Sequence, residues 1–176
     1  MIRRICSCLI LGLVLLIALA AGAQRRHDPL NPLEIDQLRD AMLDPDVRLK
    51  LYVKFARDRL DKLEQMRNDP KTTDRPRQTH DMLEDFLGVY DELNDNIDMY
   101  VGRKNDIRKV LKVVIEADTE FQAKLRALKD SAHTDATEAK QYEFILTNAI
   151  DTVDSSAEEH RQTVDEVEQY IKHKKK

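Results

Sequence analysis

The 176-residue chain has no tryptophan, four glycines and five prolines, and aromatic residues make up only 5% of it. A β-sandwich or an α/β enzyme would use more of these residues in its strands and turns. What the chain has in quantity is charge, since 35% of its residues are charged and 41% are hydrophobic. This balance is typical of long helices with charged surfaces, and the length suits a single domain.

Cysteine is also scarce, and both cysteines lie near the N-terminus. Residues 1–23 combine two early arginines, a long apolar run and a small-x-small site, which is the pattern of a cleaved secretory signal peptide. An uncleaved membrane anchor is the alternative, because the run approaches the lower length limit of a spanning helix. Cleavage before Gln24 would remove Cys6 and Cys8, and the mature chain would then have no disulfide, thiolate metal site or cysteine nucleophile.

The chain has fewer basic residues than acidic ones. The formal net charge is −4 at pH 7, and loss of the two arginines with the signal peptide would make the mature chain more acidic. An acidic, exported chain is a poor binder of nucleic acids. We therefore expect a periplasmic or secreted protein without a nucleic-acid partner. It would contact a membrane only through an uncleaved signal, or weakly through the basic segment Lys172–Lys176.

Residues 48–66, RLKLYVKFARDRLDKLEQM, begin with the alternation of a strand and continue with the spacing of a helix. Wound at 100° per residue, the whole segment gathers its apolar residues in one sector and its charges in the opposite one, which predicts an amphipathic helix. Leu51 and Phe55 lie outside the apolar stripe. They indicate either contact with more than one neighbouring helix or an apolar patch left for a partner, and we treat them as partner-patch candidates.

Residues 83–128 carry the clearest periodicity. Read in heptads, twelve of their fourteen seam positions are apolar, which is a strong coiled-coil signal. Lys104 and Asp118 interrupt the seam, and polar residues at such positions commonly set helix register and partner number. The unbroken register favours one helix over residues 79–129. A break near Gly102 is the alternative, because glycine often ends a helix.

The ends of the chain complete the predicted fold. A second seam runs over residues 136–171, after a short loop that implies an antiparallel neighbour. Asp44 and Pro45 form a cap and first-turn pair, so a helix could start there, although the heptad spacing allows a kinked continuous helix equally well. The expected fold class is all-α: an elongated antiparallel helical bundle or coiled coil of three long helices, or a four-helix bundle if the middle helix breaks near Gly102. The expected divisions are a signal peptide at 1–23, a flexible segment at 24–32, a bundle domain at 33–173 and a basic tail at 174–176.

Sequence motifs for catalysis and cofactor binding do not occur. None of the five histidines follows a glutamate by three residues, which excludes the Glu-x-x-His pairs of di-metal bundles. The sequence also has no glycine-rich phosphate loop, nucleophile elbow or metalloprotease motif. His160 lies on a seam and is a weak candidate for a metal ligand or a pH-sensitive contact, although such a residue is more often a partly buried histidine at a bundle edge. We expect neither an enzyme nor a cofactor.

Two functional hypotheses follow from these features. The first is an exported, non-enzymatic structural, scaffold or protein-interaction module that pairs with itself or with another protein of the cell envelope, and Leu51 and Phe55 motivate it. The alternative is a small-ligand or metal-binding bundle of the envelope. It is motivated by His160 and by the tyrosines at seam positions, namely Tyr52, Tyr90, Tyr100, Tyr142 and Tyr170.

Overall fold

The computed structural model describes residues 28–132 and 136–174, and these form helices without any strand. The all-α prediction is therefore confirmed. The helices are α2 (Pro32–Asp40), α3 (Pro45–Asn68), α4 (Arg75–Gly102), α5 (Arg108–Ala132), α6 (Ala136–Ala139) and α7 (Glu143–Lys174). Residues 1–23, where we expect the signal peptide, lie outside the described part of the chain. Within that part, none of the helices combines the length and the apolar character that crossing a membrane requires.

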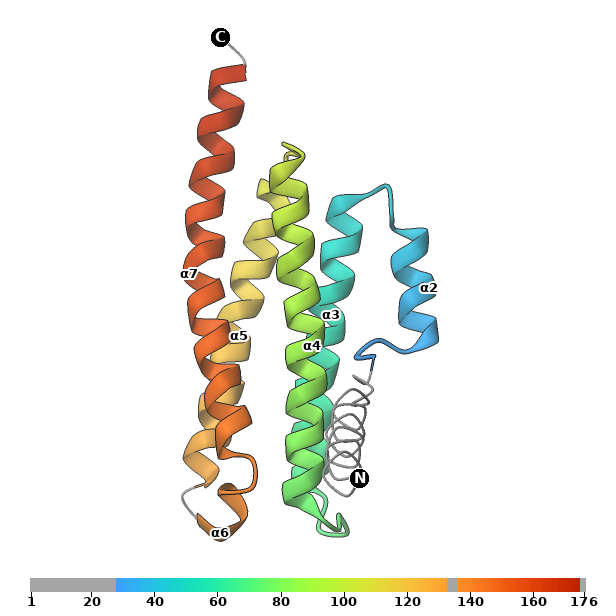
Figure 1. The fold of residues 1–176 in the computed structure, drawn as a ribbon, viewed down its shortest axis with the longest axis vertical. Helices are drawn as coiled ribbons and strands as arrows, with labels where there is room; N and C mark the ends of the chain where they lie inside the picture. The colour runs from blue at the N-terminus through green and yellow to red at the C-terminus, as the bar shows by residue number, and fades with distance from the viewer. Residues whose placement is uncertain (1–27, 133–135, 175–176) are drawn as a thin grey trace, which may run out of the picture.

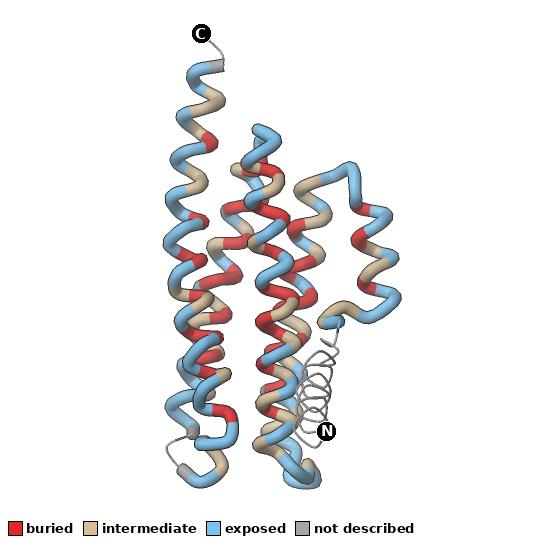
Figure 2. The backbone as a smooth tube through the Cα atoms, viewed as in Figure 1, coloured by how far each residue is buried: buried red, intermediate tan, exposed pale blue. Residues whose placement is uncertain are grey.

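The long helices form one elongated bundle. Helix α3 packs against α4 and α5, and α7 packs against the same two helices. Consecutive long helices run in opposite directions, and α2 lies outside α3 (Figure 1). Buried apolar residues from α3, α4, α5 and α7 belong to one core cluster, and buried residues recur among exposed ones along each of these helices (Figure 2). The α2–α3 and α4–α5 connections and the end of α7 lie at one end of the bundle, which we call the upper end (Figure 1).

Helix α3 begins afresh at Pro45, which decides between the two alternatives left open by the sequence. The Asp44 carboxylate accepts a hydrogen bond from the Val47 backbone N–H at 3.1 Å, and Pro45 occupies the first helical position. Proline suits that position because its missing N–H would have no partner inside the helix. The chain therefore turns between α2 and α3, and α2 folds back along the bundle (Figure 1).

The partner-patch prediction is wrong for Phe55, which is only 1% exposed and belongs to the core. Leu51 is partly buried and packs against the same core. The physical reason is the number of neighbours: α2, α4 and α5 all contact α3, so its buried sector is wider than the stripe of a two-helix seam. Of the two readings that these residues allowed, contact with several helices is the one that the structure supports.

The single helix predicted over residues 79–129 is divided into α4 and α5. Lys104 adopts a left-handed conformation with a φ of 60°. The Asn105 N–H bonds the Tyr100 carbonyl at 3.0 Å, and the Lys104 N–H bonds the Val101 carbonyl at 2.8 Å. These two bonds are those of a Schellman motif, which terminates helices. Lys104 is therefore an exposed residue of the connection, and its predicted role in setting the register of a continuous seam is wrong.

Candidate functional site

The first polar cluster lies in the centre of the bundle and joins α4, α5 and α7. The Tyr90 hydroxyl donates a hydrogen bond to Asp118 Oδ1 at 2.7 Å, and His160 Nδ1 lies 2.8 Å from Asp118 Oδ2. The side chains of Asp118 and His160 are 0% and 4% exposed, and Tyr90 is fully buried. The structure thus brings together three residues that the sequence singled out separately, namely Tyr90, Asp118 and His160.

Burial and charge keep this cluster in a defined protonation state at Tyr90. Burial raises the pKa of Tyr90, and the charge of Asp118 together with its hydrogen bond raises it further. The phenol therefore stays protonated and remains a donor to Asp118. Because Tyr90 and Asp118 are enclosed on all sides, a substrate has no route to their polar atoms, and the arrangement is suited to holding three helices together.

A pair of polar residues, Asn94 and Ser156, lies next to this cluster, one helical turn away on α4 and on α7. The Asn94 side-chain N–H donates to Ser156 Oγ at 2.9 Å, while Asn94 Oδ1 is buried without a hydrogen-bond partner among the described residues. Asn94 and Ser156 thus add a polar contact between α4 and α7 that the heptad pattern does not reveal, because serine and asparagine occur at many kinds of helical position.

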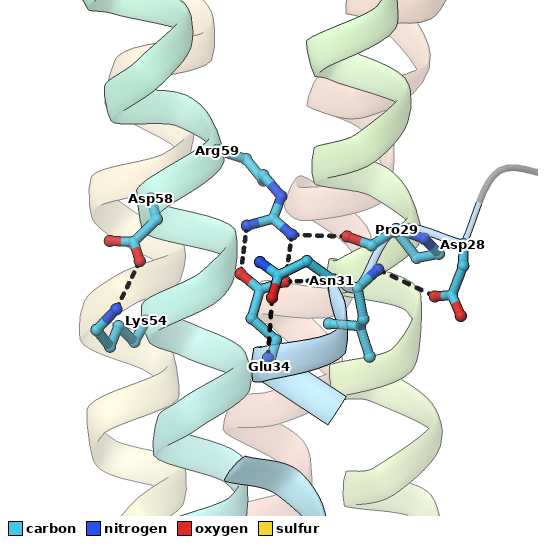
Figure 3. A network of polar contacts seen from close by, with 8 residues as sticks. Asp28, Pro29, Asn31, Glu34, Lys54, Asp58 and Arg59 are labelled. Atoms are coloured by element: carbon cyan, nitrogen blue, oxygen red, sulfur yellow. Dashed lines mark hydrogen bonds and ion pairs between the residues drawn. The ribbon is translucent and has the colours of Figure 1, made fainter. Parts of the chain in front are cut away.

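The second polar cluster lies at the side of the bundle and attaches α2 to α3 (Figure 3). The two terminal guanidinium nitrogens of Arg59, Nη1 and Nη2, donate to the Glu34 carboxylate at 2.6 Å, and Nη2 also donates to the Pro29 carbonyl at 2.6 Å. The Glu34 carboxylate accepts a further bond from the Asn31 N–H at 2.9 Å, while the Asn31 side chain caps α2. This is a capping box whose glutamate also binds an arginine.

The charge of this second cluster is settled by its hydrogen bonds. Burial by itself would raise the pKa of Glu34, but the bonds from Arg59 and from the Asn31 backbone outweigh it and hold the pKa below its ordinary value. Hydrogen bonding to Glu34 in turn raises the pKa of Arg59. Glu34 and Arg59 are therefore both ionised at neutral pH, and each of the two side chains is only 9% exposed.

Residues 28–31, which we call the strap, lead into α2 and lie across α3 and α4. Pro29 is held by Arg59 of α3, as described above, and it also touches Gly88 of α4. A Cβ atom added at Gly88 would lie 2.8 Å from Pro29 Cβ and 2.9 Å from Pro29 Cγ. This described part of the segment 24–32, which we expected to be flexible, is thus tied to two helices.

A group of side chains that could hold a metal ion lies at a different histidine from the one singled out in the sequence. Among the described residues, His80, Asp81 and Glu84 form a group whose ligand atoms all lie within 4.8 Å of one another. His80 is half-buried, and Asp81 and Glu84 are exposed on the first turns of α4. A search for a glutamate before each histidine missed this group because the acidic residues follow His80. His160 is not part of such a group, and its Nδ1 already faces Asp118.

A groove lies between α3 and α5 near the lower end of the bundle, opposite the upper end. It has a volume of about 250 Å³ and an apolar wall, and Lys124 and Arg67 lie at its edge. Both cations are already paired, Lys124 with Asp61 and Glu64, and Arg67 with Glu138. The groove therefore offers apolar surface but no unpaired cation to bind a charged ligand.

Three exposed apolar side chains lie close together in the sequence at the turn between α2 and α3, among them Leu43, the most exposed large apolar residue of the described chain. We call Met42, Leu43 and Val47 the corner patch; they are 61%, 91% and 45% exposed. A residue just before a helix cap often packs against the fourth helical residue, which here is Arg48. The Arg48 guanidinium instead bonds the Leu38 carbonyl and Asn96, so Leu43 has no apolar side chain to cover it there. The heptad pattern does not mark this patch; its signal in the sequence is the position before the Asp44 cap, where Leu43 would need an apolar partner at position 48.

Comparisons of the chain with models of protein families, with curated proteins and with solved structures found no match.

Proposed function

We propose that this chain is an exported, non-enzymatic interaction module, in which a four-helix bundle of α3, α4, α5 and α7 presents the corner patch to a partner protein. Export is proposed from the signal-like composition of residues 1–23. The four-helix arrangement is supported by the separation of α4 from α5 and by the packing of α3 and α7 against both of them.

The observation that carries the proposal is the exposure of Leu43, at 91%, beside Met42, at 61%. A single exposed apolar residue is common on protein surfaces, but adjacent ones at a turn mark a site where another surface can exclude water. Neither residue contributes to the core. Their side chains therefore provide little for folding and remain available for binding.

The alternative of a small-ligand or metal-binding bundle has weaker support. Its main residue, His160, is engaged by Asp118 in a nearly enclosed position. Three of the five seam tyrosines also weaken this alternative, because they are core residues. Tyr52, Tyr90 and Tyr142 are each at most 2% exposed. Ligand binding in the interior would require these core side chains to move, whereas binding at the corner patch requires no rearrangement.

Site-specific photo-crosslinking in cells that produce the chain tests the proposed function. A photoreactive residue is placed at Leu43 and, as a control, at Phe144, which is 87% exposed at the beginning of α7. Phe144 is matched to Leu43 in exposure but lies towards the opposite end of the bundle. We expect a defined protein adduct from position 43 and none from position 144. Absence of an adduct from position 43 would contradict the proposal.

A further inference from the structure

Helix α7 extends beyond α4 and α5 at the upper end of the bundle, the same end that carries the α2–α3 turn (Figure 1). Its last turns contain Tyr170, Ile171 and Lys172. The Lys104 ammonium lies 5.3 Å from the Tyr170 ring centre, so the α4–α5 connection touches α7 at about this height. The Lys172 side chain is 73% exposed and has a single ion-pair partner among the described residues, Glu168 on its own helix. The end of α7 is thus a projecting cationic helix.

Carboxylates flank the corner patch, and one of them, Asp46, lines a hollow together with Arg108 and Lys109 of the same chain. Asp40, Asp44 and Asp46 surround it in the sequence, and none of these three forms an ion pair with another described residue. The sides of the bundle differ, because acidic and basic residues there pair between helices. Examples are Arg57 with Glu120, Lys124 with Asp61 and Arg126 with Asp154. An apolar patch with unpaired carboxylates is suited to a partner that combines aliphatic surface with lysines.

We infer that the partner of the corner patch is the C-terminal end of α7 from a second copy of this chain, in a two-fold symmetric dimer. This inference rests on the proposed function and identifies its partner. The aliphatic stem of Lys172 lies over Met42 and Leu43 of the other copy, and its ammonium group reaches the carboxylates of Asp40 and Asp46. Lys174, two residues further along the sequence, adds a second cation.

The shape of the upper end agrees with this symmetry. Helix α7 and the α2–α3 turn lie on opposite sides of that end, with α7 reaching further along the bundle axis (Figure 1). A two-fold axis perpendicular to the bundle axis therefore brings the projecting α7 of one copy beside the lower α2–α3 turn of the other. By symmetry the second contact forms at the same time, as in any isologous interface.

Sedimentation velocity with charge reversals tests the inference. The chain from Gln24 to Lys176 is suitable because every residue of the core cluster, and every residue packed against it, lies between Leu30 and Val164. One variant carries Lys172→Glu with Lys174→Glu, a second carries Asp40→Lys with Asp46→Lys, and a third combines all four substitutions. The control is Lys71→Glu with Lys140→Glu, which changes the charge equally at exposed positions away from the upper end.

We expect the unmodified chain and the control to form a concentration-dependent dimer. Each double reversal should weaken dimerisation by about tenfold, since exposed ion pairs contribute up to about 1 kcal/mol each, and the combined variant should restore it. A chain that stays monomeric, a dimer that both reversals leave unchanged, or a combined variant that is not restored would each overturn the inference.

The crosslinking and sedimentation experiments together distinguish a failure of this inference from a failure of the proposed function. If position 43 crosslinks to a different protein while the purified chain is monomeric, the second copy is the wrong partner and the interaction module stands. If position 43 gives no adduct at all, the module itself is wrong. Binding of the monomer to vesicles of anionic lipid, lost with Lys172→Glu and Lys174→Glu, would also overturn the inference, because a lipid surface would then be what the α7 end contacts.

Discussion

The two buried polar clusters lie in different parts of the bundle, one in its centre and the other at its side. Asp118 lies in the centre and is held by the Tyr90 hydroxyl and the His160 ring, so its partners come from α4 and α7. Glu34 lies at the side and binds Arg59 through two parallel hydrogen bonds. The first cluster joins the long helices to one another, whereas the second attaches α2 to a bundle that is otherwise complete. We therefore expect their disruption to differ in both size and extent.

The largest effect should follow from Asp118→Leu. This change leaves the Tyr90 hydroxyl and the His160 ring buried without their acceptor, and breaking a buried polar pair in this way costs about 3 to 5 kcal/mol. Urea denaturation followed by circular dichroism would measure the loss, and we expect one cooperative transition at lower urea concentration. Asp118→Asn keeps the size and one acceptor oxygen and should cost less. Equal stability of the leucine variant and the unmodified chain would show that the central cluster does not join the helices.

A smaller and local effect is expected from Arg59→Met. The change leaves Glu34 without its main partner, and we expect about 2 to 3 kcal/mol less stability for the attachment of α2. Hydrogen exchange should become faster in residues 32–40 and stay unchanged in α4 and α7. Lys54→Met is the matched control, because its pair with Asp58 is 60% and 37% exposed and should contribute less than about 1 kcal/mol. Faster exchange throughout the bundle would mean that the two clusters do not differ as proposed.

The strap provides a third test, through the glycines of α4. A Cβ at Gly88 would meet Pro29 at less than 3 Å, whereas one at Gly102 would meet nothing within 4 Å. Gly88→Ala should lower the free energy of unfolding by about 1 kcal/mol, because displacement of the strap exceeds the gain in helix propensity. Gly102→Ala should be neutral or stabilising by up to about 1 kcal/mol. Thermal melting of both variants compares them, and equal melting temperatures would show that Pro29 does not need to lie against α4.

The smallest effect is a dependence on pH at the side cluster. Because the folded-state pKa of Glu34 lies below its ordinary value of 4.5, its ionised form stabilises the folded chain at any pH above 4.5. This contribution is lost as the pH falls from 4.5 through the lower folded-state value. Urea midpoints measured from neutral to acid pH should therefore decline less for Glu34→Gln than for the unmodified chain. Identical slopes below pH 4.5 would contradict a stabilising, ionised Glu34.

Much of the helical structure could be predicted because apolar periodicity reports which face of a helix is buried. The seam over residues 83–128 identified core residues of both α4 and α5. It did not reveal the break at Lys104, since two antiparallel helices that face one core can keep the same spacing across their connection. The prediction for Phe55 failed for a different reason. The sequence shows that Phe55 lies outside the apolar stripe, but it does not show how many helices surround α3.

The candidate site was predicted in part for a similar reason. Asp118 and His160 were each recognised as polar residues on a seam, but 42 positions separate them, and only the packing of α5 against α7 brings them together. Arg59 and Glu34 have no such mark in the sequence, because charged residues are common on helix surfaces.

By itself the sequence determined the all-α class and the main buried faces, since these depend on local periodicity, and it left the start of a helix at Pro45 as one of two alternatives. The tertiary structure alone decided which seams meet, where the long middle segment turns back, and which charged residues become buried partners. Those outcomes depend on contacts between residues distant in the chain, whose energies are set by packing and desolvation at the final positions of the helices.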